Sequence, residues 1–310
     1  EPMRDGSGHY KFGLSNAAVI DRLKKFDADL VAISSLFSTQ TECAIDLARD
    51  IRSELPNTPI VLGGNHASNL AEKIISEEAA VDYIIAGEAD YTFLEFLEKY
   101  FSRESIFDVE GLVWREDSKV QCNPRPKFIA NLDDLPFPAF DLYPMEEYFR
   151  IGMWHNPFTE SPRVAAIFTS RGCPQECIFC SVPGYLGHPF RAMSAERVIE
   201  LVHWHVREFS IQELQILDDN FTVDHKRVIR IMEGIKDLGL RICFPNGIRA
   251  DRPKNVEKRR IMFKAMGAAG VVSVTVTPEH GDQEFLNQVV RKKMDLVDVE
   301  TTIAVAHEND

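Results

Sequence analysis

The chain has 310 residues, of which 45% are hydrophobic and 27% charged, as expected for a globular protein with two domains of ordinary size. A formal net charge of −13 argues against a nucleic-acid ligand, because an acidic surface repels phosphates. No apolar stretch is long enough to span a bilayer and no signal-peptide pattern precedes the first strand, so a cytoplasmic location is expected.

The first part of the chain, residues 1–130, alternates short apolar runs with amphipathic segments, which predicts a parallel sheet covered by helices. Each expected strand ends in a loop with small residues, at the edge where doubly wound folds bind ligands. The expected elements are strands over 30–33, 59–62, 83–86, 111–115 and 120–122, and helices over 42–55 and 70–78.

Residues 131–162 contain repeated prolines, which predict an extended connector instead of a helix or a central strand. Residues 163–310 then repeat a strand and a helix four times, which predicts part of a βα barrel whose active site lies in the loops after the strands. The expected strands are 164–168, 213–217, 241–245 and 271–277, and the expected helices are 195–208, 225–238, 256–269 and 295–307. Because four units cannot close a standard barrel, we expect that at least two further units of the barrel are missing after residue 310. We also expect that the first strands of the front domain are missing before residue 1.

Three of the six cysteines, Cys173, Cys177 and Cys180, have the spacing C-x3-C-x2-C directly after the first expected barrel strand. Thiolates are soft ligands for iron–sulfur clusters and for zinc. Three of them without a nearby fourth leave one metal position open for a substrate or cofactor. The alternatives are a structural zinc site completed by His188, although that spacing matches zinc sites poorly, or three unligated thiols.

This motif resembles the signature of the radical S-adenosylmethionine superfamily, C-x3-C-x-aromatic-C, with Phe179 at the aromatic position. The resemblance implies a [4Fe-4S] cluster on the three cysteines, whose fourth iron binds the amino and carboxylate groups of S-adenosylmethionine. One electron from the cluster then breaks a carbon–sulfur bond and yields the 5′-deoxyadenosyl radical. The implied partners are a small-molecule or biosynthetic-intermediate substrate and an electron donor such as flavodoxin or ferredoxin.

The loops after the later barrel strands supply further candidates for binding S-adenosylmethionine. Asp218 and Asp219 follow the second strand, where the superfamily commonly has a Gly-Glu pair that receives the methionine amino group. By the same resemblance, Glu279 hydrogen-bonds the ribose hydroxyls and Arg249 pairs with a carboxylate. For each of these residues the alternative is a helix cap or a solvated loop charge.

A second motif lies in the first part of the chain. Ser34 and Leu36 form S-x-L at the end of one expected strand, and Gly63 and Gly64 end the next, with 26 residues between Leu36 and Gly63. A small hydroxyl and paired glycines let a bulky planar ligand approach the backbone closely. This pattern resembles the cobalamin-binding domain family, and the alternative is a flavodoxin-like fold that binds a flavin or nothing.

The same resemblance adds His66, Gly87 and Glu88 to the cobalamin site. For His66, a helix cap or a contact to the nucleotide tail is expected in preference to ligation of cobalt. The order of the parts, with the cobalamin-like domain before the cysteine motif, resembles cobalamin-binding radical enzymes over residues 14–307.

The implied architecture is α/β, a Rossmann-like (flavodoxin-like) cobalamin-binding domain followed by a partial radical barrel. The favoured reaction is methyl transfer from methylcobalamin to an unactivated carbon. One alternative is a cyclase or oxidoreductase that uses the same cofactors. The other is a corrinoid- or zinc-binding module without catalytic activity.

Overall fold

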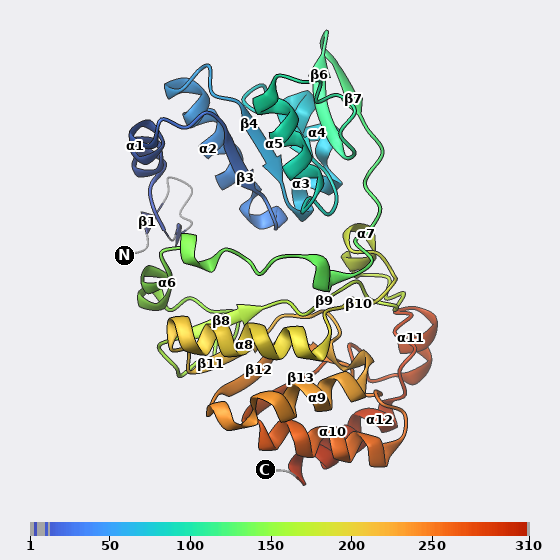
Figure 1. The fold of residues 1–310 in the computed structure, drawn as a ribbon. Coiled ribbons are helices and arrows are strands. Elements are labelled where there is room, and N and C mark those ends of the chain that lie inside the picture. Colours follow the sequence, from blue (N-terminus) through green and yellow to red (C-terminus); the bar gives the residue numbers. More distant parts are fainter. Residues whose placement is uncertain (1–2, 5–9, 12, 309–310) are drawn as a thin grey trace. The chain divides into compact units, whose positions relative to one another are not determined.

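The computed structural model describes residues 3–4, 10–11 and 13–308 (Figure 1). The chain divides into two compact units, Glu1–Phe128 and Ile129–Asp310, and each has its own hydrophobic core. Both units are α/β, which confirms the predicted fold class. Within the described residues, no helix combines the length and the apolar character needed to cross a membrane.

The first unit is built on a five-stranded sheet. β3, β4 and β5 are parallel, as predicted, and two antiparallel strands extend the sheet on the β5 side. In sheet order the strands are β3 (Val31–Ser34), β4 (Ile60–Gly63), β5 (Tyr83–Ile85), β6 (Leu112–Glu116) and β7 (Lys119–Cys122); β1 (Met3–Arg4) pairs separately with β2 (Tyr10–Lys11).

Successive side chains of this sheet face opposite sides, so that it buries both of its faces. Ile60 and Leu62 belong to one apolar cluster, whereas Val61 packs in another with Phe96 of α5 (Thr92–Ser102). The helix expected over 70–78 is preceded by a separate short helix. The helices are α1 (Asn16–Phe26), α2 (Thr41–Glu54), α3 (Asn65–Asn69), α4 (Ala71–Glu77) and α5 (Thr92–Ser102), with the 3₁₀ turn η1 (Ser38–Gln40).

The segment expected to be an extended connector contains a helix, α6 (Met145–Ile151), so the prediction is wrong there. The prolines of this segment lie outside the helix: Pro144 directly precedes it, and the next proline is Pro157. Gly152 ends the helix at φ 67°. Phe149 of α6 packs into the core of the second unit, and this burial stabilises a helix of only two turns. Two 3₁₀ turns, η2 (Leu132–Asp134) and η3 (Phe140–Leu142), precede α6.

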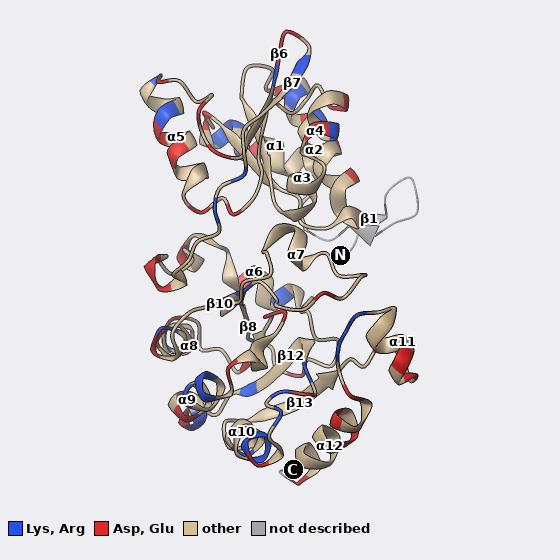
Figure 2. Ribbon diagram, turned by 90° about the vertical axis from the view of Figure 1, so that its right-hand side faces the viewer, with Lys and Arg blue, Asp and Glu red and all other residues tan. Residues whose placement is uncertain are grey.

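The second unit contains the four expected strand–helix repeats. Its strands are parallel in the order β13, β12, β11, β8, and Figure 2 shows α8, α9 and α10 along one face of the sheet. The strands are β8 (Val164–Ile167), β11 (Glu213–Ile216), β12 (Arg241–Ile248) and β13 (Val271–Val276); the helices are α8 (Ala195–Phe209), α9 (His225–Ile235), α10 (Val256–Ala268) and α12 (Leu296–His307).

Several elements of the second unit differ from the prediction. β12 continues to Ile248, beyond the expected end at residue 245, because a register shift after Phe244 lets the strand pass Asn246 and Gly247. A short hairpin brackets the cysteine loop. The elements that were not predicted are β9 (Ser170–Arg171), β10 (Arg191–Ala192), α7 (Val182–Tyr185), α11 (Gln283–Gln288), η4 (Phe221–Val223) and η5 (Lys236–Leu238).

Candidate active site and cobalamin loops

The three cysteines of the motif lie between β9 and α7 and line one cavity of about 200 Å³. All three carry free, half-buried thiols. Among the described residues, no three Cys, His, Asp or Glu side chains converge closely enough to hold a single metal ion. In a [4Fe-4S] cluster each thiolate binds a different iron, so the ligands surround a volume and do not meet at a point. The thiols therefore fit a cluster better than a mononuclear zinc site, and His188 does not line this cavity.

Burial raises the pKa of the Cys177 and Cys180 thiols, because a thiolate is poorly solvated there. The ammonium of Lys292 acts in the opposite direction on both thiols, and Arg249 does so on Cys177. These two cations line the same cavity and stabilise the thiolate forms that a metal requires.

Gly172 fixes the start of the cysteine loop. Its φ is 82°, and a Cβ at this position would lie 2.3 Å from the carbonyl oxygen of Pro189. Only glycine fits both the backbone conformation and the space, so steric constraints require a glycine directly before Cys173.

Asp218 does not line the cavity. Its buried carboxylate accepts hydrogen bonds from the Thr169 backbone N–H at 2.5 Å and from the hydroxyls of Thr169 and Ser170, each at 2.6 Å. Burial raises the pKa of Asp218, and the donors from Ser170 and Thr169 oppose this effect. Asp218 thus fixes the end of β8 and the start of the cysteine loop.

The two residues that follow do line the cavity. Burial, together with the charge of Asp218, raises the pKa of Asp219 to about 6. The Asn220 side-chain N–H₂ lies 3.9 Å from the sulfur of Cys173, and its buried Oδ1 has no hydrogen-bond partner among the residues that the structure describes. An unpartnered buried acceptor is costly unless a ligand supplies a donor, so this oxygen fits a cavity that binds an amine or hydroxyl group.

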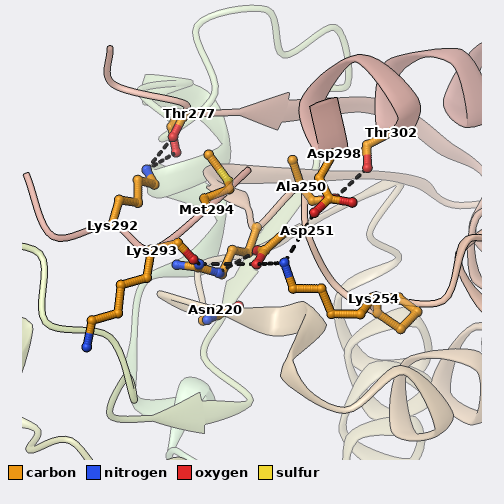
Figure 3. Close-up of polar contacts among 12 residues, drawn as sticks. Asn220, Ala250, Asp251, Lys254, Thr277, Lys292, Lys293, Met294, Asp298 and Thr302 are labelled. Carbon is orange, nitrogen blue, oxygen red and sulfur yellow. Dashed lines mark hydrogen bonds and ion pairs between the residues drawn. The ribbon is translucent and has the colours of Figure 1, made fainter. Parts of the chain in front are cut away.

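Arg249 is buried at the wall of the cavity, where a carboxylate of the protein already pairs with it. Its Nε lies 2.6 Å from Asp251, and its Nη2 donates to the carbonyl oxygen of Lys293 at 2.8 Å. Asp251 also pairs with the ammonium of Lys254, at 3.1 Å, as Figure 3 shows. Arg249 is therefore rigidly oriented.

Glu279 and Phe179 also line the cavity. The Phe179 ring is exposed, whereas Glu279 follows β13 in a left-handed conformation and accepts a hydrogen bond of 2.7 Å from Lys292. Lys292 was not among the sequence candidates, because it lies in the run Arg291-Lys292-Lys293, and charge runs are usually solvated.

In the first unit, the carboxyl ends of β3 and β4 meet at Gly64. Its φ is 95°, and a Cβ there would lie 2.6 Å from the Ser35 carbonyl oxygen and 3.2 Å from the Ser34 hydroxyl. The Ser35 N–H in turn donates to the Gly63 carbonyl oxygen at 2.8 Å. Leu36, the next residue, is exposed, so an apolar side chain lies at the edge of the sheet where a ligand is expected.

The remaining cobalamin candidates surround this edge. The Gly87 N–H donates to the Ser68 hydroxyl at 3.0 Å, which ties the end of β5 to α3. Nδ1 of His66 lies 2.8 Å from the Ser38 hydroxyl, and Glu88 is buried. The structure thus gathers the candidates of all three parallel strands at one edge, as the strand order requires.

Comparison with protein families identifies both units. A model of the B12 binding domain matches residues 9–97, and a model of the radical SAM superfamily matches residues 167–310. Cytidylyl-2-hydroxyethylphosphonate methyltransferase of Streptomyces wedmorensis is 30% identical over 96% of this chain and 58% of its own length. An uncharacterized methyltransferase of Pyrococcus horikoshii, PH0819, is 34% identical over 74% of this chain and 48% of its own length. The chain therefore spans about half the length of these relatives.

A solved structure supports the same fold. The cobalamin-dependent S-adenosylmethionine radical enzyme OxsB, with aqua-cobalamin and S-adenosylmethionine bound, superposes with a TM-score of 0.74 at 21% identity. The match covers 94% of this chain and 41% of OxsB. With a B12 binding domain followed by a radical SAM domain, the chain belongs to the cobalamin-binding radical S-adenosylmethionine enzyme family.

Proposed function

We propose that this protein transfers a methyl group to an unactivated carbon of a small substrate. The observation that carries the proposal is the cavity in which three free thiols meet Asp219, Arg249 and Glu279. The relatives named above that are methyltransferases support the same reaction class.

The residues of the cavity divide into two groups by their chemistry. Cys173, Cys177 and Cys180 would hold a [4Fe-4S] cluster, which when bound supplies the electron for cleavage of S-adenosylmethionine. Asp219 and the free Oδ1 of Asn220 are acceptors suited to the methionine ammonium. We assign Glu279 to the ribose hydroxyls, Arg249 to the carboxylate end and Phe179 to the apolar wall.

In the first unit we assign cobalamin to the loops that end β3, β4 and β5. The main chain at Gly63 and Gly64 offers close approach, with Ser34, Leu36, Gly87 and Glu88 around it. The bond between His66 and Ser38 directs the imidazole toward the turn that follows β3, so we assign His66 to the nucleotide tail and not to cobalt. Figure 1 shows these loops together below the sheet of the first unit.

The proposal includes the cellular setting. Iron–sulfur chemistry of this kind requires a reducing compartment, so we propose a cytoplasmic enzyme that receives electrons from a flavodoxin or ferredoxin. The net charge of −13 argues against nucleic acid as a partner. We also propose domain boundaries at residues 1–130 and 163–310, joined by residues 131–162.

Anaerobic reconstitution with iron, sulfide and hydroxocobalamin tests the proposal. We expect about four irons bound per chain, about one cobalamin, and 5′-deoxyadenosine when S-adenosylmethionine and a reductant are added. Cys177→Ala should lose the iron and keep the cobalamin, whereas Cys122→Ala, an exposed cysteine of the first unit, should keep both. Stoichiometric zinc in place of iron would overturn the proposal.

A further inference from the structure

The segment 290–293 connects two distant parts of the cavity wall. The Ile178 N–H, inside the cysteine motif, donates to the Val290 carbonyl oxygen at 3.1 Å. Arg249 donates to the Lys293 carbonyl oxygen at 2.8 Å, and the Lys293 ammonium lies 2.5 Å from Glu176. The segment is therefore bonded to the cysteine loop and to the end of β12.

Lys292 points inward from this segment, and its side chain is only 10% exposed. Figure 3 shows its ammonium directed at the carbonyl and hydroxyl oxygens of Thr277, at the end of β13. Its third acceptor is Glu279 Oε1, at 2.7 Å. An ammonium has three N–H donors, so Lys292 is saturated by the protein and its position is fixed.

This arrangement determines what Glu279 can do. A non-glycine residue at φ 73° is strained, and such a conformation persists only when its surroundings hold it in place. Lys292 engages Oε1, and among the described residues Oε2 has no hydrogen-bond donor. One oxygen of Glu279 is therefore anchored, and the other remains a strong acceptor on a side chain that lines the cavity.

The charge of Lys292 also lies beside the proposed cluster site. Lys292 lines the same cavity as Cys173, Cys177 and Cys180. A positive charge near a cluster stabilises the reduced, more negative state and so raises its reduction potential.

We propose that Lys292 is a positioning residue that holds Glu279 for the hydroxyls of a bound nucleoside and raises the reduction potential of the cluster. The inference rests on the proposed function, in which S-adenosylmethionine supplies the nucleoside. It assigns the role to one lysine of the run and not to its neighbour Lys293, whose side chain is 62% exposed.

The test compares Lys292→Met with Lys293→Met in the chain reconstituted with iron and sulfide. For Lys292→Met we expect S-adenosylmethionine affinity, measured by equilibrium binding, to fall roughly 10-fold, because a charged hydrogen bond is lost. The midpoint potential, followed by electron paramagnetic resonance without S-adenosylmethionine, should become more negative. Lys293→Met should change the affinity less than about twofold and leave the potential unchanged, because exposed ion pairs contribute little.

A double-mutant cycle tests whether Lys292 acts through Glu279. In a Glu279→Gln background, Lys292→Met should weaken binding much less than it does alone, because the two changes remove the same interaction. Additive effects would overturn the positioning role. Unchanged affinity and potential in Lys292→Met would overturn the whole inference.

Two further measurements separate this inference from the proposed function. If the unmodified chain binds neither iron nor S-adenosylmethionine, the proposed function fails; if it binds both and Lys292→Met behaves identically, only the inference fails. Should Lys292→Met not retain iron, Lys292→Arg replaces it, because that variant keeps the charge but changes its geometry. It should lose affinity while keeping the potential near that of the unmodified chain, and a large negative shift would contradict the electrostatic role.

Discussion

The carboxylate of Asp218 accepts a hydrogen bond of 2.6 Å from the hydroxyl of Ser170. Asp218 follows β11, and Ser170 begins the short strand that leads into the cysteine loop, so the bond connects neighbouring strand ends of the second unit. Since only two residues separate Ser170 from Cys173, the geometry of the thiols depends on a carboxylate that does not contact them.

Replacement of Asp218 by alanine should therefore destabilise the second unit by about 3–5 kcal/mol, because buried donors of Thr169 and Ser170 lose their acceptor. The variant should also retain less iron after reconstitution. Calorimetry and iron quantitation measure the two effects.

Asp219→Asn is the matched control. Because burial and the neighbouring Asp218 raise the pKa of Asp219 to about 6, neutralising it removes an unfavourable charge and should not lower the melting temperature. Equal destabilisation by the two substitutions would contradict the anchoring role of Asp218.

The sequence predicted the sheets well and the cavity wall only in part. Apolar runs such as Ile60–Leu62 have few alternatives to a buried strand, so β4 lies within one residue of its expected position. Because of the repeated prolines, an extended connector was predicted where α6 lies, although Phe149 places this helix in the core. Local sequence patterns indicate which residues are buried, and they predict helices and strands correctly where burial alone determines the structure.

Lys292 and Asp218 show why the rest could not be predicted. The role of Lys292 follows from bonds to Thr277 and Glu279, and that of Asp218 from bonds to residues 48 and 49 positions away. Adjacent aspartates look equivalent in sequence, yet Asp218 accepts from the hydroxyls of Thr169 and Ser170, whereas Asp219 lines the cavity. Such pairings depend on tertiary contacts that no local pattern encodes.

Gly63 and Gly64 should respond differently to substitution by alanine. At Gly64 a Cβ meets the Ser35 carbonyl at 2.6 Å in a left-handed conformation, so Gly64→Ala should lower the melting temperature of the first unit and abolish cobalamin binding. At Gly63 the nearest atom is 3.9 Å away, so Gly63→Ala should leave the melting temperature unchanged.

If cobalamin packs against this edge, Gly63→Ala should still weaken its binding, because the added methyl group occupies space needed by the ligand. Absorbance titration with hydroxocobalamin measures the affinity, and calorimetry measures the stability. Full cobalamin affinity in both variants would rule out this edge as the binding site.

His205 should make the stability of the second unit depend on pH. Its ring is buried among Phe140, Trp204 and Phe209, its Nδ1 lies 2.9 Å from the Leu201 carbonyl oxygen, and burial lowers its pKa. The folded-state pKa of His205 is below the ordinary value of about 6.5, so the folded protein favours the neutral ring. The stability that the buried neutral ring contributes is therefore fully present above that pH and is lost as the pH falls below it.

His205→Phe should reduce the fall in melting temperature between pH 7.5 and pH 5.5, since phenylalanine has no proton to bind (both values are roughly one unit from the ordinary histidine pKa). His203→Phe is the control, because His203 lies two residues away on the same helix and is exposed. It should leave the pH dependence as it is. An equal reduction in both variants would show that His205 is not the responsible group.

The buried Arg259 should be a main determinant of stability at the end of the second unit. Its guanidinium has no exposed surface and donates to Asp298 at 2.8 Å, to Thr302 at 3.1 Å and to the Pro253 carbonyl oxygen. Thr302 in turn donates to the Ala250 carbonyl oxygen at 2.5 Å (Figure 3). Ala250 directly follows Arg249 of the cavity wall in the chain.

Arg259→Ala should therefore destabilise the unit by about 3–5 kcal/mol, because it leaves a cavity and deprives Asp298 and Thr302 of their donor. Arg260→Ala is the matched control: it truncates the next side chain of α10, a half-exposed arginine paired with Glu308, and should change the melting temperature little.

Since the network reaches the residue beside Arg249, Arg259→Ala should also weaken S-adenosylmethionine binding, whereas Arg260→Ala should not. If both variants melt at the same temperature, the buried network does not hold α10 and α12 against the cavity wall.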